Sequence, residues 1–230
     1  MEYPSLDTAK AGAIRFNTDS IQLEIYDGNQ WTGIQATSPD LLTGGTRGVL
    51  GAGRSEGGAS QTKINNIQYI NIATTGNAID FGDMAAATSG GASGQSPTRG
   101  LFLGGSPAPT TANRINTIQY LTMSTLGNTS DFGDMIKEAS HMAGCSNSIR
   151  TLIGAGAAKN STTLLNDIEF VTIATLGNAQ DFGDMTATRT NQRNGGASPT
   201  RAIFVGGYGS TSSPYGTNVI DYVEIMTTGN

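Results

Sequence analysis

The chain has 230 residues, of which 13% are charged and 37% are hydrophobic, and its net charge is −5. A chain of this length can bury a substantial core, and 32 glycines with so few charges are typical of a turn-rich β protein. The negative charge argues against a nucleic-acid-binding surface, which needs an excess of Lys and Arg. No apolar run approaches the length of a membrane span, so we predict none.

Residues 1–35 differ from the rest of the chain and predict a small β-meander. Two alternating segments, Ala13–Asn17 and Gln22–Tyr26, flank a polar turn, and a second turn leads to a short strand near Trp31. Three such strands bury little on their own. We therefore expect residues 1–35 to be an attachment module that contacts a partner. Its predicted interface consists of Phe16, Ile25, Tyr26 and Trp31.

Residues 36–45 predict a linker or a closing strand, and residues 46–230 repeat one pattern. The copies span 46–97, 98–148, 149–199 and, incompletely, 200–230. An arginine opens each copy, and the signature Asp-Phe-Gly-Asp-Met recurs in the first three. The arginines are Arg47, Arg99, Arg150 and Arg201. This period of about 51 residues indicates a repeat architecture.

Each copy predicts four short strands. The first is apolar and ends in glycine, and the second, around Tyr120 in the second copy, is apolar on both faces and must be covered on both. The third holds Phe132 and Met135, and the fourth is a Gly-rich run, Met142–Cys145. Four strands per repeat, covered by neighbouring repeats, predict a propeller blade. The predicted fold class is therefore an all-β propeller preceded by an N-terminal hairpin.

The repeat resembles the kelch repeat. That family has a short apolar strand ending in Gly-Gly, an aromatic residue in the second strand, and an aromatic residue and a Met in the third. The second copy has Gly104-Gly105, Tyr120, Phe132 and Met135 at these places, although kelch usually has Trp where Phe132 stands. The first and third copies also carry Gly-Ala-Gly in place of the double glycine. The resemblance implies a kelch-like propeller and no single activity, because such propellers host enzymes, adaptors and virion proteins.

The N-terminal segment carries a second resemblance. Gly12–Asp19, Leu23–Gly28 and Trp31 are similar to a short module common in structural and fibre proteins of tailed phages, and the repeats resemble those of virion proteins from marine tailed phages. Together they imply a location in the virion and a non-enzymatic structural role in a tail, neck or fibre appendage. The implied partners are other virion proteins, with a homo-oligomer formed through the N-terminal module.

Two other functions stay open: an adhesin that binds a host-surface glycan, and a propeller glycosidase or lyase. An enzyme of the second kind needs clustered carboxylates or histidines on one face, and the sequence shows no such cluster. His141 is the only histidine, and the Asp-Phe-Gly signature lacks the other motifs of a kinase. We therefore predict no catalytic residue, no cofactor and no metal site.

The loop after the first strand varies most between copies, which predicts a contact surface there. The candidate binding residues in these loops are Arg54, Lys63, Arg114, Tyr208 and Tyr215. The repeated arginines are interpreted as structural clamps between blades. Three repeated phenylalanines are interpreted as core residues; they are Phe81, Phe132 and Phe182.

Overall fold

The computed structural model describes residues 9–18, 22–34, 47–54, 62–107, 113–160, 163–190, 195–209 and 216–229. Across these residues the regular structure consists of strands without a helix, which confirms the predicted all-β class. The chain divides into two compact units, Met1–Leu41 and Leu42–Asn230. We refer to them as unit 1 and unit 2.

Unit 1 contains one antiparallel sheet in the order β1-β2-β3. Its strands are β1 (Ile14–Asn17), β2 (Gln22–Tyr26) and β3 (Trp31–Gly33). The turn between β2 and β3 is shaped by Asp27, whose Oδ1 accepts the backbone N–H groups of Asn29 and Gln30 at 2.8 Å each. A carboxylate that bonds the backbone two and three residues on is a common way to fix such a turn.

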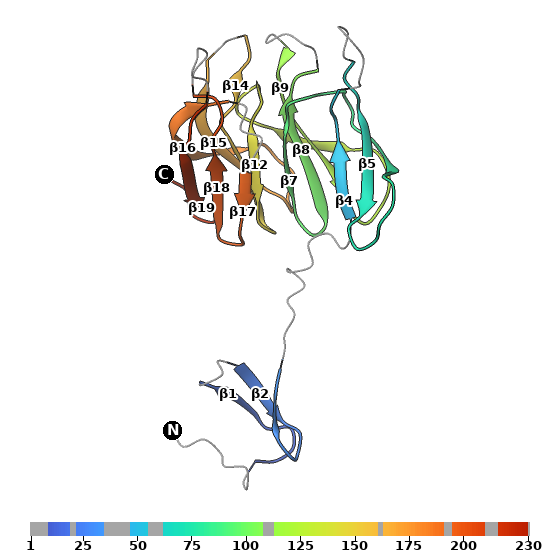
Figure 1. The fold of residues 1–230 in the computed structure, drawn as a ribbon, viewed down its shortest axis with the longest axis vertical. Helices are drawn as coiled ribbons and strands as arrows, with labels where there is room; N and C mark the ends of the chain where they lie inside the picture. The colour runs from blue at the N-terminus through green and yellow to red at the C-terminus, as the bar shows by residue number, and fades with distance from the viewer. Residues whose placement is uncertain are drawn as a thin grey trace. The chain divides into compact units, whose positions relative to one another are not determined.

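Among its described residues, unit 2 contains four antiparallel sheets of three or four strands that follow one another along the chain, and Figure 1 shows them side by side. The first sheet has β4 (Arg47–Gly51), β5 (Asn66–Asn71) and β6 (Ile79–Asp83). The second has β7 (Ala92–Gln95), β8 (Arg99–Gly105), β9 (Ile115–Thr122) and β10 (Ser130–Asp134). The third has β12 (Ala143–Ser146), β13 (Arg150–Gly154), β15 (Leu165–Thr172) and β16 (Gln180–Arg189). The fourth has β17 (Gly195–Ala197), β18 (Arg201–Val205) and β19 (Ile220–Glu224). A two-stranded ladder joins β11 (Ala139–Ser140) to β14 (Ala157–Ala158).

The sequence pattern predicts that the Gly-rich strand is the last strand of its own repeat, and this grouping is wrong. Instead β7, β12 and β17 each pair with the arginine-bearing strand of the following copy, so the second, third and fourth sheets begin before their arginines. A tight turn explains this pairing. In the third sheet Asn147 Oδ1 accepts the N–H groups of Ile149 and Arg150, and Ser198 Oγ plays this role in the fourth. Such turns favour a hairpin between adjacent strands.

Three hydrophobic cores lie between successive sheets. The first joins Ile67 and Phe81 of the first sheet to Leu121 and Met123 of the second. The next two repeat this arrangement between the second and third sheets and between the third and fourth. Burial of apolar surface between sheets therefore holds unit 2 together, and each sheet is stabilised by its neighbours.

Candidate interaction surface

The hairpin of unit 1 places four apolar side chains on one face. Ile14 pairs with Ile25, and Phe16 pairs with Leu23, across β1 and β2. Because side chains alternate between the faces of a strand, all four point to the same side. They are exposed: Ile14 at 61%, Phe16 at 51%, Leu23 at 44% and Ile25 at 36%. We call this set the hairpin face.

The opposite face of the same sheet is covered by its own side chains. Arg15 lies over the ring of Trp31 at 4.2 Å and donates to Glu24 at 2.8 Å. Hydrogen bonds from Asn17 and Arg15 lower the pKa of Glu24 below its ordinary value. Tyr26 packs against Trp31 with ring centroids 5.4 Å apart. These contacts hold the sheet together and leave the hairpin face as the side available to a partner.

The predicted attachment residues therefore divide between two faces. Phe16 and Ile25 lie on the exposed hairpin face. Tyr26 is buried and Trp31 is half-buried on the other side, so Tyr26 is wrongly placed in an exposed interface. Ile14 and Leu23 lie on the hairpin face as well, although neither is among the predicted attachment residues. The two-residue alternation of β1 and β2 would have found both, because it separates them from Tyr26.

The predicted loop residues are not gathered into one surface. Lys63 donates to the backbone oxygen of Ser106 in the next repeat, and the buried Arg114 donates to that of Ala158. Burial lowers the pKa of both side chains. Arg54 lies 3.4 Å from Ser89 Oγ, and Tyr208 is exposed. Tyr215 lies outside the described residues. Arg114 in particular is turned into the protein and joins two repeats.

The repeated arginines join successive sheets in three of the four copies. Nη1 donates to a backbone oxygen of the next copy: Arg47 to Met123 at 2.7 Å, Arg99 to Ile173 at 2.8 Å and Arg150 to Ile225 at 3.2 Å. Each guanidinium also lies over an aromatic ring of its own copy, at 4.4 to 5.1 Å from the centroid. This is the geometry of a clamp, with a cation–π contact on one side and a charge-assisted hydrogen bond on the other.

The three repeated phenylalanines are buried, and each meets the aromatic residue of its own second strand edge to face. The backbone oxygen of each phenylalanine accepts an N–H group from a glycine of the neighbouring repeat. Gly127, for example, donates from its N–H to the oxygen of Phe81 at 2.8 Å, and Gly177 donates to Phe132 at 2.9 Å. The Asp-Phe-Gly-Asp-Met signature therefore supplies core packing and a docking point for the next sheet.

A cavity of about 850 Å³ on unit 2 runs along the Gly-rich strands beside the first sheet. Glycine and serine line most of it, and its ionisable side chains are Arg54 and His141. His141 Nδ1 lies 2.9 Å from Ser140 Oγ. Among the described residues, this lining offers backbone groups and two basic side chains and includes no acidic side chain.

Within the described ranges, no three His, Cys, Asp or Glu side chains gather into a group that could hold a metal ion. The same residues include no helix long and apolar enough to cross a lipid bilayer. No protein-family model matches the chain, and a search of curated proteins finds no match.

Proposed function

We propose that this chain is a non-enzymatic structural component of a tailed-phage virion, in which residues 1–35 attach a displayed kelch-like propeller to the particle. The observation that carries the proposal is the hairpin face. Four large apolar side chains are uncovered on a sheet too small to bury them, and contiguous apolar surface of this kind marks a site of protein association.

The arrangement of unit 2 supports the propeller part of the proposal. Antiparallel sheets of up to four strands succeed one another and bury their faces against their neighbours. The Gly-rich strands of neighbouring sheets approach one another closely. A Cβ at Gly195 would lie only 2.7 Å from the backbone oxygen of Gly144. Small residues at the converging strands of radially packed sheets suit a propeller. A repeated scaffold whose inner sheets cover one another's faces can fold without support from the particle.

The direct test is to purify the virions of the phage that encodes this sequence and to locate the chain in them by cryo-electron microscopy. We expect density for the sheets of unit 2 at the surface of the tail, neck or a fibre, with unit 1 in contact with another virion protein. Absence of the chain from purified particles would overturn the proposal.

A panel of host polysaccharides distinguishes the proposed role from the two alternatives. A structural component leaves the polymers intact and does not bind them. Depolymerisation would indicate a glycosidase or lyase, and binding without cleavage would indicate an adhesin. A matched variant, Tyr208→Ala, tests whether any binding uses the exposed loop tyrosine.

A further inference from the structure

The three internal interfaces of unit 2 use the same two faces each time. The forward face of a sheet points to the following sheet, and in the second sheet it carries Leu101, Leu103, Ile118 and Tyr120. The backward face points to the preceding sheet, and in the second sheet it carries Phe102, Leu121 and Met123. The chain thus shows three times which side chains a forward face binds.

The forward face of the fourth sheet is uncovered. Ile220 is 63% exposed, whereas its three counterparts Ile67, Ile118 and Ile168 are each 0% exposed. Tyr222 is 62% exposed, and Ile203 and Val205 beside it are exposed as well. Strand β19 is the edge of this sheet among the described strands.

The backward face of the first sheet is uncovered in the same way. Ile72 is 67% exposed, whereas its counterparts Met123, Ile173 and Ile225 are at most 4% exposed. Leu50 and Ile70 are exposed on the same side. In the second, third and fourth sheets, the forward face of the preceding sheet covers the residues at these positions.

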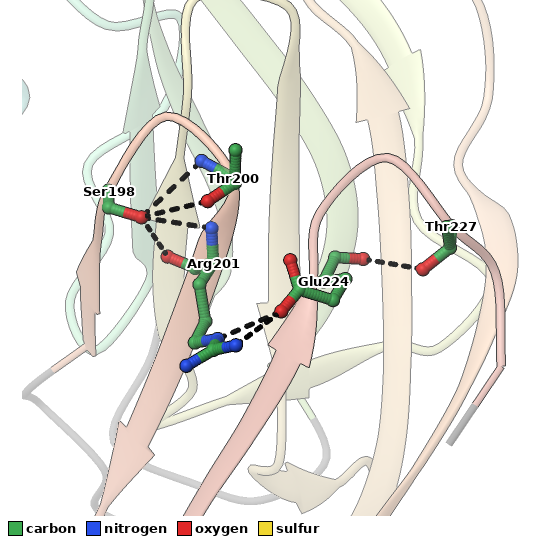
Figure 2. Close-up of polar contacts among 5 residues, drawn as sticks. All are labelled: Ser198, Thr200, Arg201, Glu224 and Thr227. Carbon is green, nitrogen blue, oxygen red and sulfur yellow. Dashed lines mark hydrogen bonds and ion pairs between the residues drawn. The ribbon is translucent and has the colours of Figure 1, made fainter.

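Among the described residues, Arg201 lacks the hydrogen bond to a following sheet that the other three repeated arginines make. Its Nε and Nη2 bond Glu224 Oε1 at 2.9 and 2.8 Å, and its guanidinium lies over Tyr222. Figure 2 shows the guanidinium held beside Glu224, while Ser198 Oγ shapes the turn that precedes it. Nη1, which bonds the next copy in Arg47, Arg99 and Arg150, has no acceptor among the described residues. The equivalent acceptor on a first sheet is the backbone oxygen of Ile72.

We propose that the forward face of the fourth sheet binds the backward face of the first sheet in a second copy of this chain, head to tail. The occupant follows from the continuity of this surface with the three internal interfaces, whose pattern of apolar contact and arginine clamp it extends. In the complex, Tyr222 and Ile220 cover Ile70 and Ile72 of the second copy, and Arg201 Nη1 donates to the oxygen of its Ile72. Such an interface is heterologous, so it forms a closed ring or a chain of copies. The proposal does not rest on the virion role.

Sedimentation velocity on the full chain tests this pairing. The parent protein is the full chain with Phe16→Lys and Leu23→Lys, which remove association through the hairpin face. Every other variant is made in this parent. Ile72→Glu blocks one face and Tyr222→Glu blocks the other. We expect the parent to form dimers or larger species as its concentration rises. Each blocked variant should be monomeric, with at least a tenfold weaker association and an unchanged circular dichroism spectrum.

The decisive measurement is an equimolar mixture of the two blocked variants. A head-to-tail contact leaves one intact pair of faces in the mixture, so we expect a dimer and nothing larger. Leu126→Glu changes another exposed apolar residue, outside both faces, and this variant should associate like the parent. A mixture that stays monomeric would overturn the proposal, as would blocked variants that each still dimerise. A parent that is monomeric at all concentrations would also overturn it.

Discussion

At the scale of single residues, the repeated phenylalanines give the most direct test of the packing. Phe132 is 3% exposed and lies in the core between the second and third sheets. We expect Phe132→Ala to lower the free energy of unfolding by about 3–5 kcal/mol, because it leaves a cavity between sheets that cannot easily collapse. Urea denaturation of the variant measures this loss. An unchanged denaturation midpoint and slope would show that Phe132 does not pack in a core between the second and third sheets.

The clamp predicts a difference between two arginines. Arg99 joins the second sheet to the third, whereas Arg201 is exposed and contacts only its own sheet among the described residues. Arg99→Met leaves the oxygen of Ile173 without its charged donor, so we expect a loss of about 1.5–3 kcal/mol. Arg201→Met breaks an exposed ion pair and should cost at most about 1 kcal/mol. Equal losses for the two variants, measured by chemical denaturation, would contradict the role of the clamp between sheets.

Glu169 predicts a dependence of stability on pH. Its carboxylate accepts the N–H groups of Ile136 and Lys137 of the preceding repeat at 2.8 and 3.0 Å. Burial raises its pKa above the ordinary value of 4.5 in spite of these bonds. The folded protein therefore holds this proton more tightly than the unfolded chain. The corresponding stability is present below about pH 4.5 and is lost as the pH rises through the folded pKa.

Glu169→Gln should remove this dependence, because the amide does not ionise. We expect the unfolding free energy of the variant, relative to the native chain, to increase between about pH 4 and pH 7. The chain offers a mirror control at Gln119, which occupies the same place in the second sheet and accepts the N–H of Ala85. Gln119→Glu should introduce the dependence that Glu169→Gln removes. A pH-independent difference in either pair would contradict the assignment.

Repetition decided which residues the sequence could identify. The phenylalanines stood out as core candidates because they recur beside a methionine. Arg189 did not, because its counterparts are Thr88 and Ala139. It is fully buried, pairs with Asp221 and donates from Nη1 to Val219 at 3.0 Å. A contact that occurs in one copy leaves no periodic signal and needs the structure to reveal it.

At the scale of elements, the strands were visible in the sequence but their grouping was not. A repeat has no intrinsic starting point, so the period alone cannot say whether a Gly-rich strand closes one sheet or opens the next. The short serine or asparagine turns before Arg99, Arg150 and Arg201 settle the question, because they tie the Gly-rich strand to the arginine strand as a hairpin. The hairpin face could be predicted only in part, because aromatic character does not say which face of a strand a residue occupies, whereas strand alternation does.

The turn between β15 and β16 of the third sheet packs against β10 of the second sheet, and this contact makes its own prediction. Gly133 and Gly177 share nearly the same backbone angle, φ +142° and +147°. A Cβ at Gly133 would lie 2.5 Å from the oxygen of Gly177, whereas a Cβ at Gly177 would meet no atom within 4 Å. Gly177→Ala should cost about 1–3 kcal/mol from backbone strain. Gly133→Ala should cost more, because it also pushes the neighbouring sheet away.

The difference between these two variants isolates the contact between sheets from the strain of the glycine conformation. Thermal denaturation of both proteins under one set of conditions measures it. If Gly133→Ala is no worse than Gly177→Ala, the close approach of the two repeats does not contribute to stability.

At the scale of the whole molecule, the two units differ in how they satisfy their apolar surface. Among the described residues, unit 2 buries much of its apolar surface between its own sheets, and its two end faces are open. Unit 1 leaves the hairpin face open although its other face is closed by Arg15, Trp31 and Tyr26. Burying one large apolar side chain contributes roughly 1.5–3 kcal/mol, so a partner that covers four of them gains a substantial driving force. The proposed attachment through unit 1 and display of unit 2 rest on this contrast.

Deleting residues 1–35 tests the division of labour. Because the cores of unit 2 do not use these residues, we expect a folded β-rich protein with a cooperative transition by circular dichroism. The deleted protein should keep the head-to-tail association of unit 2 and should no longer be incorporated into particles when it replaces the full chain. Quantitative mass spectrometry of purified virions measures this loss.

Point variants in the full chain distinguish the loss of the hairpin face from the loss of the whole segment 1–35. Phe16→Lys with Leu23→Lys places two charges on that face and should reduce incorporation as strongly as the deletion. Gln22→Lys adds a charge to the opposite face of the same sheet and should leave incorporation unchanged, because alternation directs its side chain away from Leu23. Normal incorporation of the double variant would move the attachment site to unit 2. Failure of the deleted protein to fold would mean instead that the N-terminal strands belong to the packing of the repeats.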